Sequence, residues 1–313
     1  MGSIRTILGD IPAVSFGITY VHEHTISQPP RSFRQWEADL VLDSIPNIVQ
    51  EISAFRALGG SCLVDATAVD YGRDVNAMVQ VAELSGVHII ATAGFNKGDY
   101  FTPAIAAASR EELEAYIWRE ATEGMDGTKY RPGMLKFGTG YNRMSEAEER
   151  TARAVCRVQS KTGLPLYTHT EIGTLGLEQI GLLREENVNP ERVCIGHIDR
   201  NPDAWYAKEL LKCGVYIGID QIGKIKYHPE QIRINLIIHL VRHGYGKKIL
   251  LSGDMARRSY LRSYGGGPGF RYILDQFIPR LKAQMAEASF TPQTAEAVCN
   301  DLLIENPKRF FSL

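Results

Sequence analysis

The sequence is poor in the features that mark several protein classes. Its five cysteines are an odd number and form no Cys-x-x-Cys pair, which argues against a disulfide framework and favours reduced thiols. No apolar run approaches the ~18 residues of a membrane-spanning helix, and the N-terminus lacks a secretory signal's charged, apolar and cleavage regions. The opening Met-Gly-Ser-Ile-Arg-Thr fits the loose N-myristoylation pattern, which is too short to outweigh these absences. We expect a soluble cytoplasmic protein with no membrane partner.

An excess of charge of one sign is also lacking. The 35 basic and 36 acidic residues leave a formal net charge of −1, so there is no global attraction for nucleic acid, and no nucleic-acid partner is expected. Neither GxGxxG nor GxxxxGK[ST] follows an apolar run, which removes the main argument for an open nucleotide-binding sheet. With 44% hydrophobic residues among 313, the chain has ordinary globular composition and enough length to bury a core.

Short β-rich runs alternate with longer amphipathic stretches along the chain. Eight such units in about 250 residues predict parallel strands with helical crossovers, and fit a closed (β/α)8 TIM barrel better than an open sheet. We expect a single domain, 1–313, with a short N-terminal hairpin, a barrel over about 17–290 and a C-terminal helical extension. Strands are predicted at 18–22, 61–65, 88–93, 134–137, 165–169, 193–197, 215–219 and 249–252, and helices at 43–58, 74–85, 110–123, 145–162, 174–187, 202–213, 229–243 and 268–282.

Two histidines stand one residue apart at the end of the first predicted barrel strand, where the active sites of such barrels lie. Side chains alternate along a strand, so His22 and His24 are expected to point the same way, into the barrel. Glu23 between them is expected to face the helical layer and to take no part in the chemistry. Such a pair alone is a weak signal, and its interpretation depends on the rest of the chain.

Four more side chains of this kind follow at later strand ends. Each alone has an ordinary interpretation, such as a structural histidine or a helix-capping aspartate. Together they would surround one barrel mouth, where imidazoles and a carboxylate suit Zn²⁺ or a similar ion that activates water. The lysine could serve this metal site as a carbamate formed with CO2. Two other interpretations are open: a metal-free lyase in which the lysine is the Schiff-base nucleophile, and a barrel that binds metal without catalysis. The four are Lys136, His169, His197 and Asp254.

The segments GITYVHEH, LKFGTG, GLPLYTHT, NPERVCIGHIDRN and ENPKRFF are similar, in this order, to those of the phosphotriesterase-like family of the amidohydrolase superfamily. The resemblance implies a hydrolase of ester bonds with two divalent ions, for which Zn²⁺ is expected and Mn²⁺ or Co²⁺ are alternatives. It implies that Asp254 is the catalytic residue, which takes a proton from a metal-bridging hydroxide. The implied ligands are His22, His24 and Asp254 on one ion, His169 and His197 on the other, and Lys136, carboxylated by CO2, between them.

Basic loops after the seventh and eighth predicted strands favour one branch of that family. TIM barrels frequently bind phosphate there, and arginine and lysine suit a phosphate dianion. The segment RRSYLRSYGGGPG also resembles the sugar-phosphate lactonase branch. We therefore expect a small-molecule substrate, the γ-lactone of a phosphorylated aldonic acid. As a separate expectation, the enzyme is a homodimer. The expected substrate contacts are Lys97, Tyr100, Lys224, Lys226, Arg257, Arg258 and Tyr260.

Organophosphate triesters and acyl-homoserine lactones are the alternative substrates within the family. Arg200 and Gln221 stand where the triesterase branch carries an acidic residue and a histidine. This departure counts against efficient triester hydrolysis.

Overall fold

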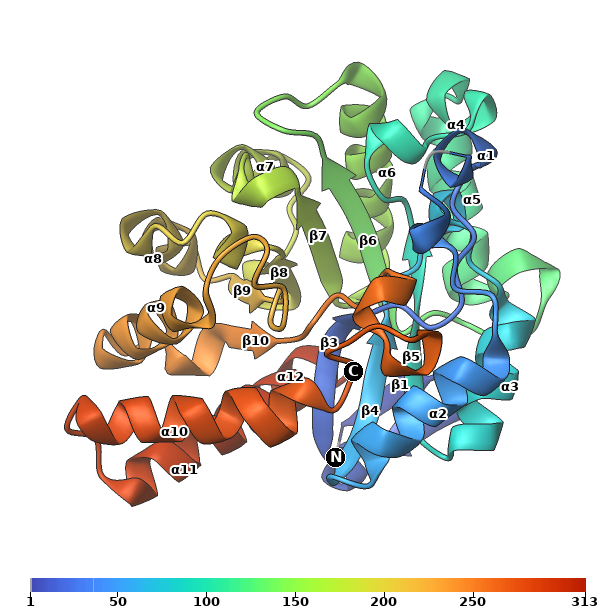
Figure 1. Ribbon diagram of the computed structural model, residues 1–313. Coiled ribbons are helices and arrows are strands. Elements are labelled where there is room, and N and C mark those ends of the chain that lie inside the picture. The colour runs from blue at the N-terminus through green and yellow to red at the C-terminus, as the bar shows by residue number, and fades with distance from the viewer. Residues whose placement is uncertain (1, 36) are drawn as a thin grey trace.

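In the computed structural model, which describes residues 2–35 and 37–313, eight parallel strands form a nearly closed barrel inside a layer of helices (Figure 1). The predicted TIM-barrel class is confirmed. The strands follow one another around the sheet in chain order, and the first and last of them are the two ends of the sheet. They are β3 (Ile18–Glu23), β4 (Gly60–Asp65), β5 (His88–Gly94), β6 (Met134–Thr139), β7 (Leu166–Thr170), β8 (Val193–Ile195), β9 (Tyr216–Ile219) and β10 (Ile249–Leu251).

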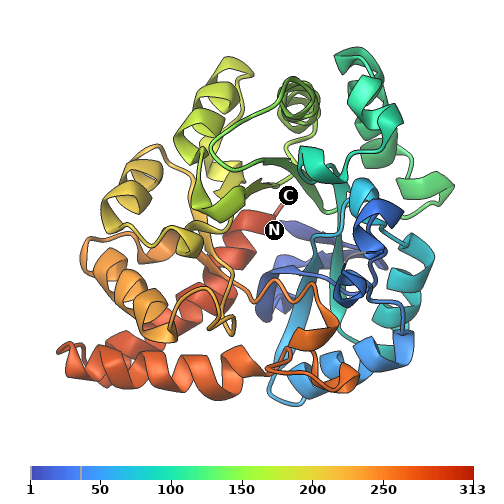
Figure 2. The same cartoon turned by 45° about the horizontal axis from the view of Figure 1, so that its top comes forward.

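Helices of the outer layer surround the strands in Figure 2. Their ends follow local sequence signals: Ser109 and Ser145 each begin a helix with a capping box, and Gly163 ends one in the left-handed conformation. The long helices are α2 (Ile45–Arg56), α3 (Val75–Ser85), α5 (Arg110–Thr122), α6 (Glu146–Thr162), α7 (Gly176–Glu185), α8 (Ala204–Lys212), α9 (Glu230–Arg242) and α10 (Ile278–Glu287).

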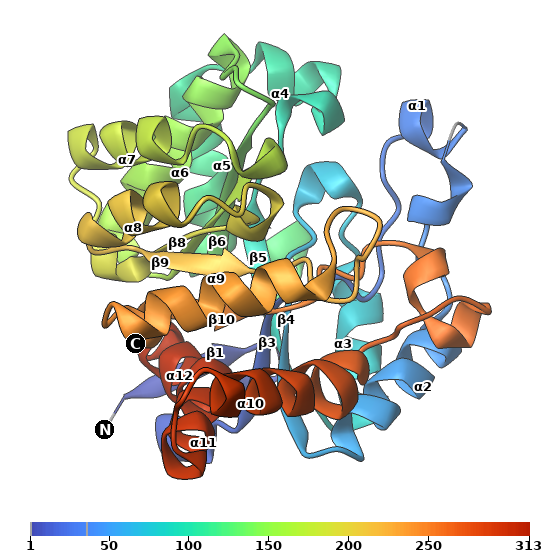
Figure 3. The same ribbon diagram turned by 60° about the vertical axis from the view of Figure 1, so that its left-hand side comes forward.

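The termini form the opposite end of the molecule from the short helices α1 (Arg31–Arg34) and α4 (Pro103–Ala107), as Figure 3 shows. The predicted N-terminal hairpin is present as β1 (Ser3–Thr6) and β2 (Gly9–Pro12). The C-terminal extension consists of α11 (Pro292–Asn300) and α12 (Asn306–Phe311). The backbone N–H of Leu313 donates to the carbonyl of Ser3 over 2.8 Å, so the two termini lie together beneath the barrel.

Two predicted element boundaries were wrong for identifiable reasons. The strand expected over 193–197 ends at Ile195, because His197 has a left-handed φ of 59° that leaves the strand conformation. The helix expected over 268–282 begins as a π turn at Ile273–Phe277 and continues to Glu287. The residues before it are held in a loop, in which the N–H of Phe270 bonds Glu51.

The core has an outer and an inner part, as strands covered on both faces require. Tyr20 packs outward, with its ring centroid 4.5 Å from that of Phe55 on α2. Its neighbour Val21 belongs to the inner cluster, which the terminal side chains Phe310 and Phe311 complete. The inner cluster therefore leaves the C-terminal ends of the strands for polar side chains. None of the helices in the described part of the chain has the length and apolar character needed to span a bilayer.

Candidate active site

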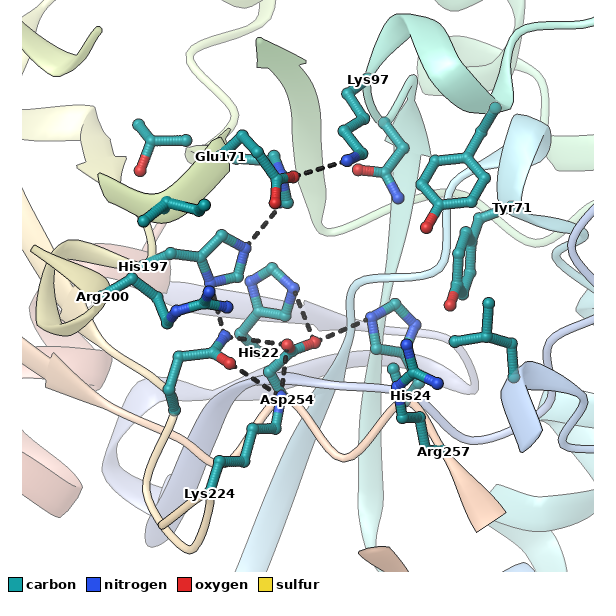
Figure 4. Close-up of a pocket in the computed structure, with 18 of the residues that line it drawn as sticks. His22, His24, Tyr71, Lys97, Glu171, His197, Arg200, Lys224, Asp254 and Arg257 are labelled. Carbon is teal, nitrogen blue, oxygen red and sulfur yellow. Dashed lines mark hydrogen bonds and ion pairs between the residues drawn. The ribbon is translucent and has the colours of Figure 1, made fainter. Parts of the chain in front are cut away.

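A cavity of about 320 Å³ opens at the C-terminal ends of the strands (Figure 4). All of the predicted metal ligands line it, and so do five of the seven predicted substrate contacts. The long segments that separate these residues in the chain are the helical crossovers of the barrel. The cavity residues that the sequence predicted are His22, His24, Lys97, Tyr100, Lys136, His169, His197, Lys224, Asp254, Arg257 and Tyr260.

A β-bulge in β3 aims His22 into the cavity. Tyr20 pairs with Leu63 and Glu23 with Asp65, so β3 has one residue more than β4 between these pairs. Strict alternation after the outward Tyr20 and inward Val21 would turn His22 outward. Bulges are frequent next to active sites, where they redirect a side chain in this way. The expected inward direction of His22 and His24 is therefore present, but it depends on an irregularity that simple alternation does not provide.

His22 and His24 direct one ring nitrogen each at the carboxylate of Asp254. The Nε2 atoms lie 3.6 and 3.3 Å from Asp254 Oδ1. The other nitrogen of His24, Nδ1, is 2.7 Å from Thr67 Oγ1, whereas Nδ1 of His22 is buried without a hydrogen-bond partner. These three side chains form a group whose ligand atoms lie close enough to hold one metal ion.

His169 and His197 form the second half of the cluster. Nδ1 of His169 lies 2.8 Å from Nε2 of His197. Each remaining nitrogen has a carboxylate partner: Glu171 Oε2 is 3.0 Å from His169 Nε2, and Asp220 Oδ1 is 2.8 Å from His197 Nδ1. One nitrogen of each ring is held by a carboxylate, as in metal-binding histidines, and the other faces the partner ring across this 2.8 Å contact. The donor set therefore fits a bound cation on this side as well.

Lys136 extends from β6 into the floor of the cavity and is buried. Its Nζ donates to the carbonyl of Ala66 over 2.9 Å. Burial lowers the pKa of the amine, against the opposing effect of nearby carboxylates such as Asp254 and Asp70. A neutral amine is the form that reacts with CO2 or with a carbonyl compound, so this environment suits either predicted chemistry of Lys136.

Asp254 presents its two carboxylate oxygens to different partners. Oδ1 faces His22 and His24, whereas Oδ2 accepts from Lys224 Nζ over 2.6 Å and from Gln221 Nε2 over 2.9 Å. Burial alone would raise the pKa of Asp254, but the Lys224 ammonium and the surrounding histidines outweigh it and hold that pKa well below its ordinary value. Asp254 is therefore ionised at neutral pH, and Lys224, predicted to contact substrate, lines the cavity and bonds this carboxylate.

The other predicted substrate contacts differ in position. Lys97 pairs with Glu171 over 2.6 Å at the cavity wall, and Arg257 pairs with Glu37 over 2.7 Å beside it. Two predicted contacts are not among the described residues that line the cavity. Arg258 donates to the Val41 carbonyl and pairs with Asp43, 2.7 and 2.8 Å away, and the exposed Lys226 lies 4.9 Å from the ring centroid of Tyr260.

Sequence reasoning missed several residues at this site. Asp220 follows β9 as Asp254 follows β10, so the same strand-end signal could have found it. It is fully buried, accepts from Tyr167 and orients His197. It could complete a second cation-binding group with His22 and His197. Glu171, two residues after His169, had no distinguishing pattern in the sequence.

The family model described as the Phosphotriesterase family matches residues 2–311. The phospho-furanose lactonase of Mycoplasmopsis synoviae is 31% identical over 97% of this chain and 90% of its own length. The crystal structure of a lactonase from Listeria monocytogenes is similar with a TM-score of 0.94 and 39% identity, over 99% of this chain and 98% of that one. The phosphotriesterase homology protein of Escherichia coli, solved with phosphate in its active site, has a TM-score of 0.88 and 31% identity, over 95% and 99% of the two chains.

Proposed function

This chain belongs to the phosphotriesterase family and is a lactonase-type hydrolase of ester bonds; from that premise we propose that it opens the γ-lactone ring of a phosphorylated sugar acid with two divalent metal ions. The observation that carries the proposal is one cavity that is lined both by a cluster of histidines with Asp254 and by cationic side chains. Because the family match spans 2–311, we also propose that 1–313 is one hydrolase domain.

The proposed metal ligands are those whose free donor atoms converge. His22, His24 and Asp254 would hold one ion, because their ligand atoms lie close together, and His169 with His197 would hold the other, because their inner nitrogens lie 2.8 Å apart. Lys136 as a carbamate would supply the anion between them. When bound, the ions, Zn²⁺ in this proposal, would supply an activated water and polarise the lactone carbonyl.

Asp254 moves the proton in the proposed reaction. Ionised and placed beside the histidine pair, its carboxylate accepts the proton of the water that attacks the carbonyl carbon. As the bond between this carbon and the ring oxygen breaks, Asp254 returns the proton to the departing alkoxide, which leaves a hydroxy acid. Lys224 and Gln221 hold Oδ2 meanwhile and keep the carboxylate oriented.

The cationic side chains of the cavity support a phosphorylated substrate. Arg200, Lys224 and Arg257 line the cavity together with Tyr227 and Tyr260. The guanidinium carbon of Arg200 lies 3.5 Å from the ring centroid of Tyr227, which orients this side chain over the opening. A phosphate held here would orient the lactone without entering the chemistry. The name of the Mycoplasmopsis relative and the phosphate in the Escherichia coli structure also support this substrate class.

A pH-indicator assay of sugar γ-lactones with and without a 5-phosphate tests the proposal. Two charge-assisted hydrogen bonds at ~1.5 kcal/mol each predict a kcat/KM about 100-fold higher for the phosphorylated lactone. An acyl-homoserine lactone and a phosphotriester complete the panel. Faster turnover of any unphosphorylated or acyl-chain lactone would contradict the proposed substrate.

A further inference from the structure

The buried carboxylate of Glu23 holds the turn that carries Asp254. Oε1 accepts from the N–H of Gly253 over 2.7 Å and from the hydroxyl of Ser252 over 2.8 Å. Oε2 accepts from the N–H of Met255 over 2.8 Å. Glu23 therefore binds the peptide N–H groups on both sides of Asp254 while contributing nothing to the cavity lining itself.

Asp254 needs such support because of its backbone conformation. Its φ is 47°, in the left-handed region that non-glycine residues rarely adopt, and such conformations persist where the surroundings impose them. Its own N–H donates to the carbonyl of His22 over 3.0 Å. The turn also approaches closely: a Cβ on Gly253 would lie 2.6 Å from the Met255 side chain and 3.3 Å from Glu23 Oε1. Only a glycine fits there without displacing these contacts.

The contact lies at the seam of the barrel. β3 and β10 are the two ends of the sheet, so no strand pairing of the described residues fixes one against the other. The seam is joined instead by the bond from the Asp254 N–H to His22, by Glu23 and by Ser252, whose Oγ also accepts from the N–H of His22 over 2.9 Å. The placement of His22 and His24 relative to Asp254 therefore depends on contacts made by the residue between the two histidines.

We infer that Glu23 is a positioning residue: its carboxylate holds the Ser252–Met255 turn so that Asp254 directs Oδ1 at His22 and His24. This inference rests on the proposed role of Asp254 and corrects the expectation that Glu23 takes no part. Glu23 acts on the reaction only by holding the backbone of this turn, because it does not line the cavity and would not contact a substrate bound there. The geometry assigns it the same kind of support for Asp254 that Asp220 gives His197.

Glu23→Gln is the test, because glutamine keeps the shape but turns an NH2 group toward one of the two peptide N–H groups. Outer partners of metal ligands typically account for 10–100-fold in affinity or activity. We expect Zn²⁺ affinity, measured by chelator competition, and kcat each to fall about 10- to 100-fold, with KM within about twofold. Glu23→Asp, which keeps the charge and shortens the reach, should fall between wild type and Glu23→Gln.

Glu51→Gln is the matched control. Glu51 is also buried and accepts the N–H groups of Ser263 and Phe270 in the loop after the same strand, but it contacts no proposed ligand. We expect this control to lower the melting temperature without changing kcat or Zn²⁺ affinity. The inference would be overturned if Glu23→Gln had the kcat and Zn²⁺ affinity of wild type and only a lower melting temperature. If Glu23→Gln does not fold, the same result in Glu23→Asp would overturn it. If wild type opens no lactone, the proposed substrate fails, and the Zn²⁺ affinities still decide the role of Glu23.

Discussion

Replacing Arg257 with alanine should raise the KM for a phosphorylated lactone about tenfold and leave kcat nearly unchanged. A hydrogen bond from a guanidinium to a charged group contributes ~1.5–3 kcal/mol. Arg257 already pairs with Glu37 over 2.7 Å, and its side chain is 24% exposed. Competition and screening place the loss at the lower end, about 1.4 kcal/mol, which corresponds to a factor of ten.

The adjacent arginine supplies the matched control for this experiment. Arg258 has the same side chain, but its guanidinium bonds the Val41 carbonyl and Asp43 outside the cavity. Arg258→Ala should therefore keep KM within about twofold of wild type.

Initial rates over a range of substrate concentrations, with phosphorylated and unphosphorylated forms of one lactone, separate the effects. Arg257→Ala should affect only the phosphorylated form. An equal rise in KM for both forms, a similar rise in Arg258→Ala, or a fall in kcat at unchanged KM would each refute the assignment of Arg257 to the phosphate.

Three further changes test other parts of the account. In the metal-free protein, burial and the neighbouring His197 lower the pKa of His169 to about 4, below the 6.5 of an ordinary histidine. Because the unfolded chain then binds the extra proton, His169 by itself should lower the free energy of unfolding by about 2 kcal/mol between pH 7 and pH 5, and urea titrations should show a fall smaller by about this amount in His169→Asn. Lys136→Met should reduce bound metal below two ions per chain in elemental analysis and lower kcat about 1,000-fold, since several kcal/mol of charge stabilisation are lost. Arg73→Met should lower the free energy of unfolding by ~3–5 kcal/mol in urea, because it leaves the buried Glu120 without the guanidinium that pairs it.

The architecture was predictable because its signals are local. Apolar runs, helix caps and stop glycines repeat along the chain, and the predicted strand order follows directly from their alternation. The convergence of the ligand-type residues followed from the same order, since parallel barrel strands end at one mouth. His22 shows the limit of this reasoning: its direction is set by a bulge that depends on the pairing of β3 with β4.

Contacts between distant loops could not be predicted from local signals. Arg258 and Lys226 carry the positive charge that suits a phosphate. Arg258 is nevertheless held outside the cavity by Asp43 and Val41, which lie more than two hundred residues earlier in the chain. Lys224 likewise bonds Asp254 on the next loop. The role of Glu23 at Asp254 could not be predicted because its partners, the N–H groups of Gly253 and Met255, lie more than two hundred residues later in the chain, after the strand that closes the barrel.

Measuring bound metal distinguishes the proposed carbamate of Lys136 from the alternative, in which Lys136 is the Schiff-base nucleophile of a metal-free lyase. A Schiff-base lyase would use the same buried amine, whose pKa is lowered by burial. It would leave the converging nitrogens of His22, His24, His169 and His197 without a function. In the described structure the inner nitrogens of His169 and His197 face each other, and those of His22 and His24 face Asp254. The outer nitrogens have carboxylate or hydroxyl partners, except for Nδ1 of His22.

A zinc titration of chelator-treated protein, followed by hydrolysis of a phosphorylated sugar γ-lactone, tests the central claim most directly. We predict that the metal-free protein is inactive and that activity rises to a plateau at two ions per chain, in the presence of bicarbonate to form the carbamate on Lys136. Full activity without metal, accompanied by borohydride trapping of a substrate on Lys136, would contradict the account.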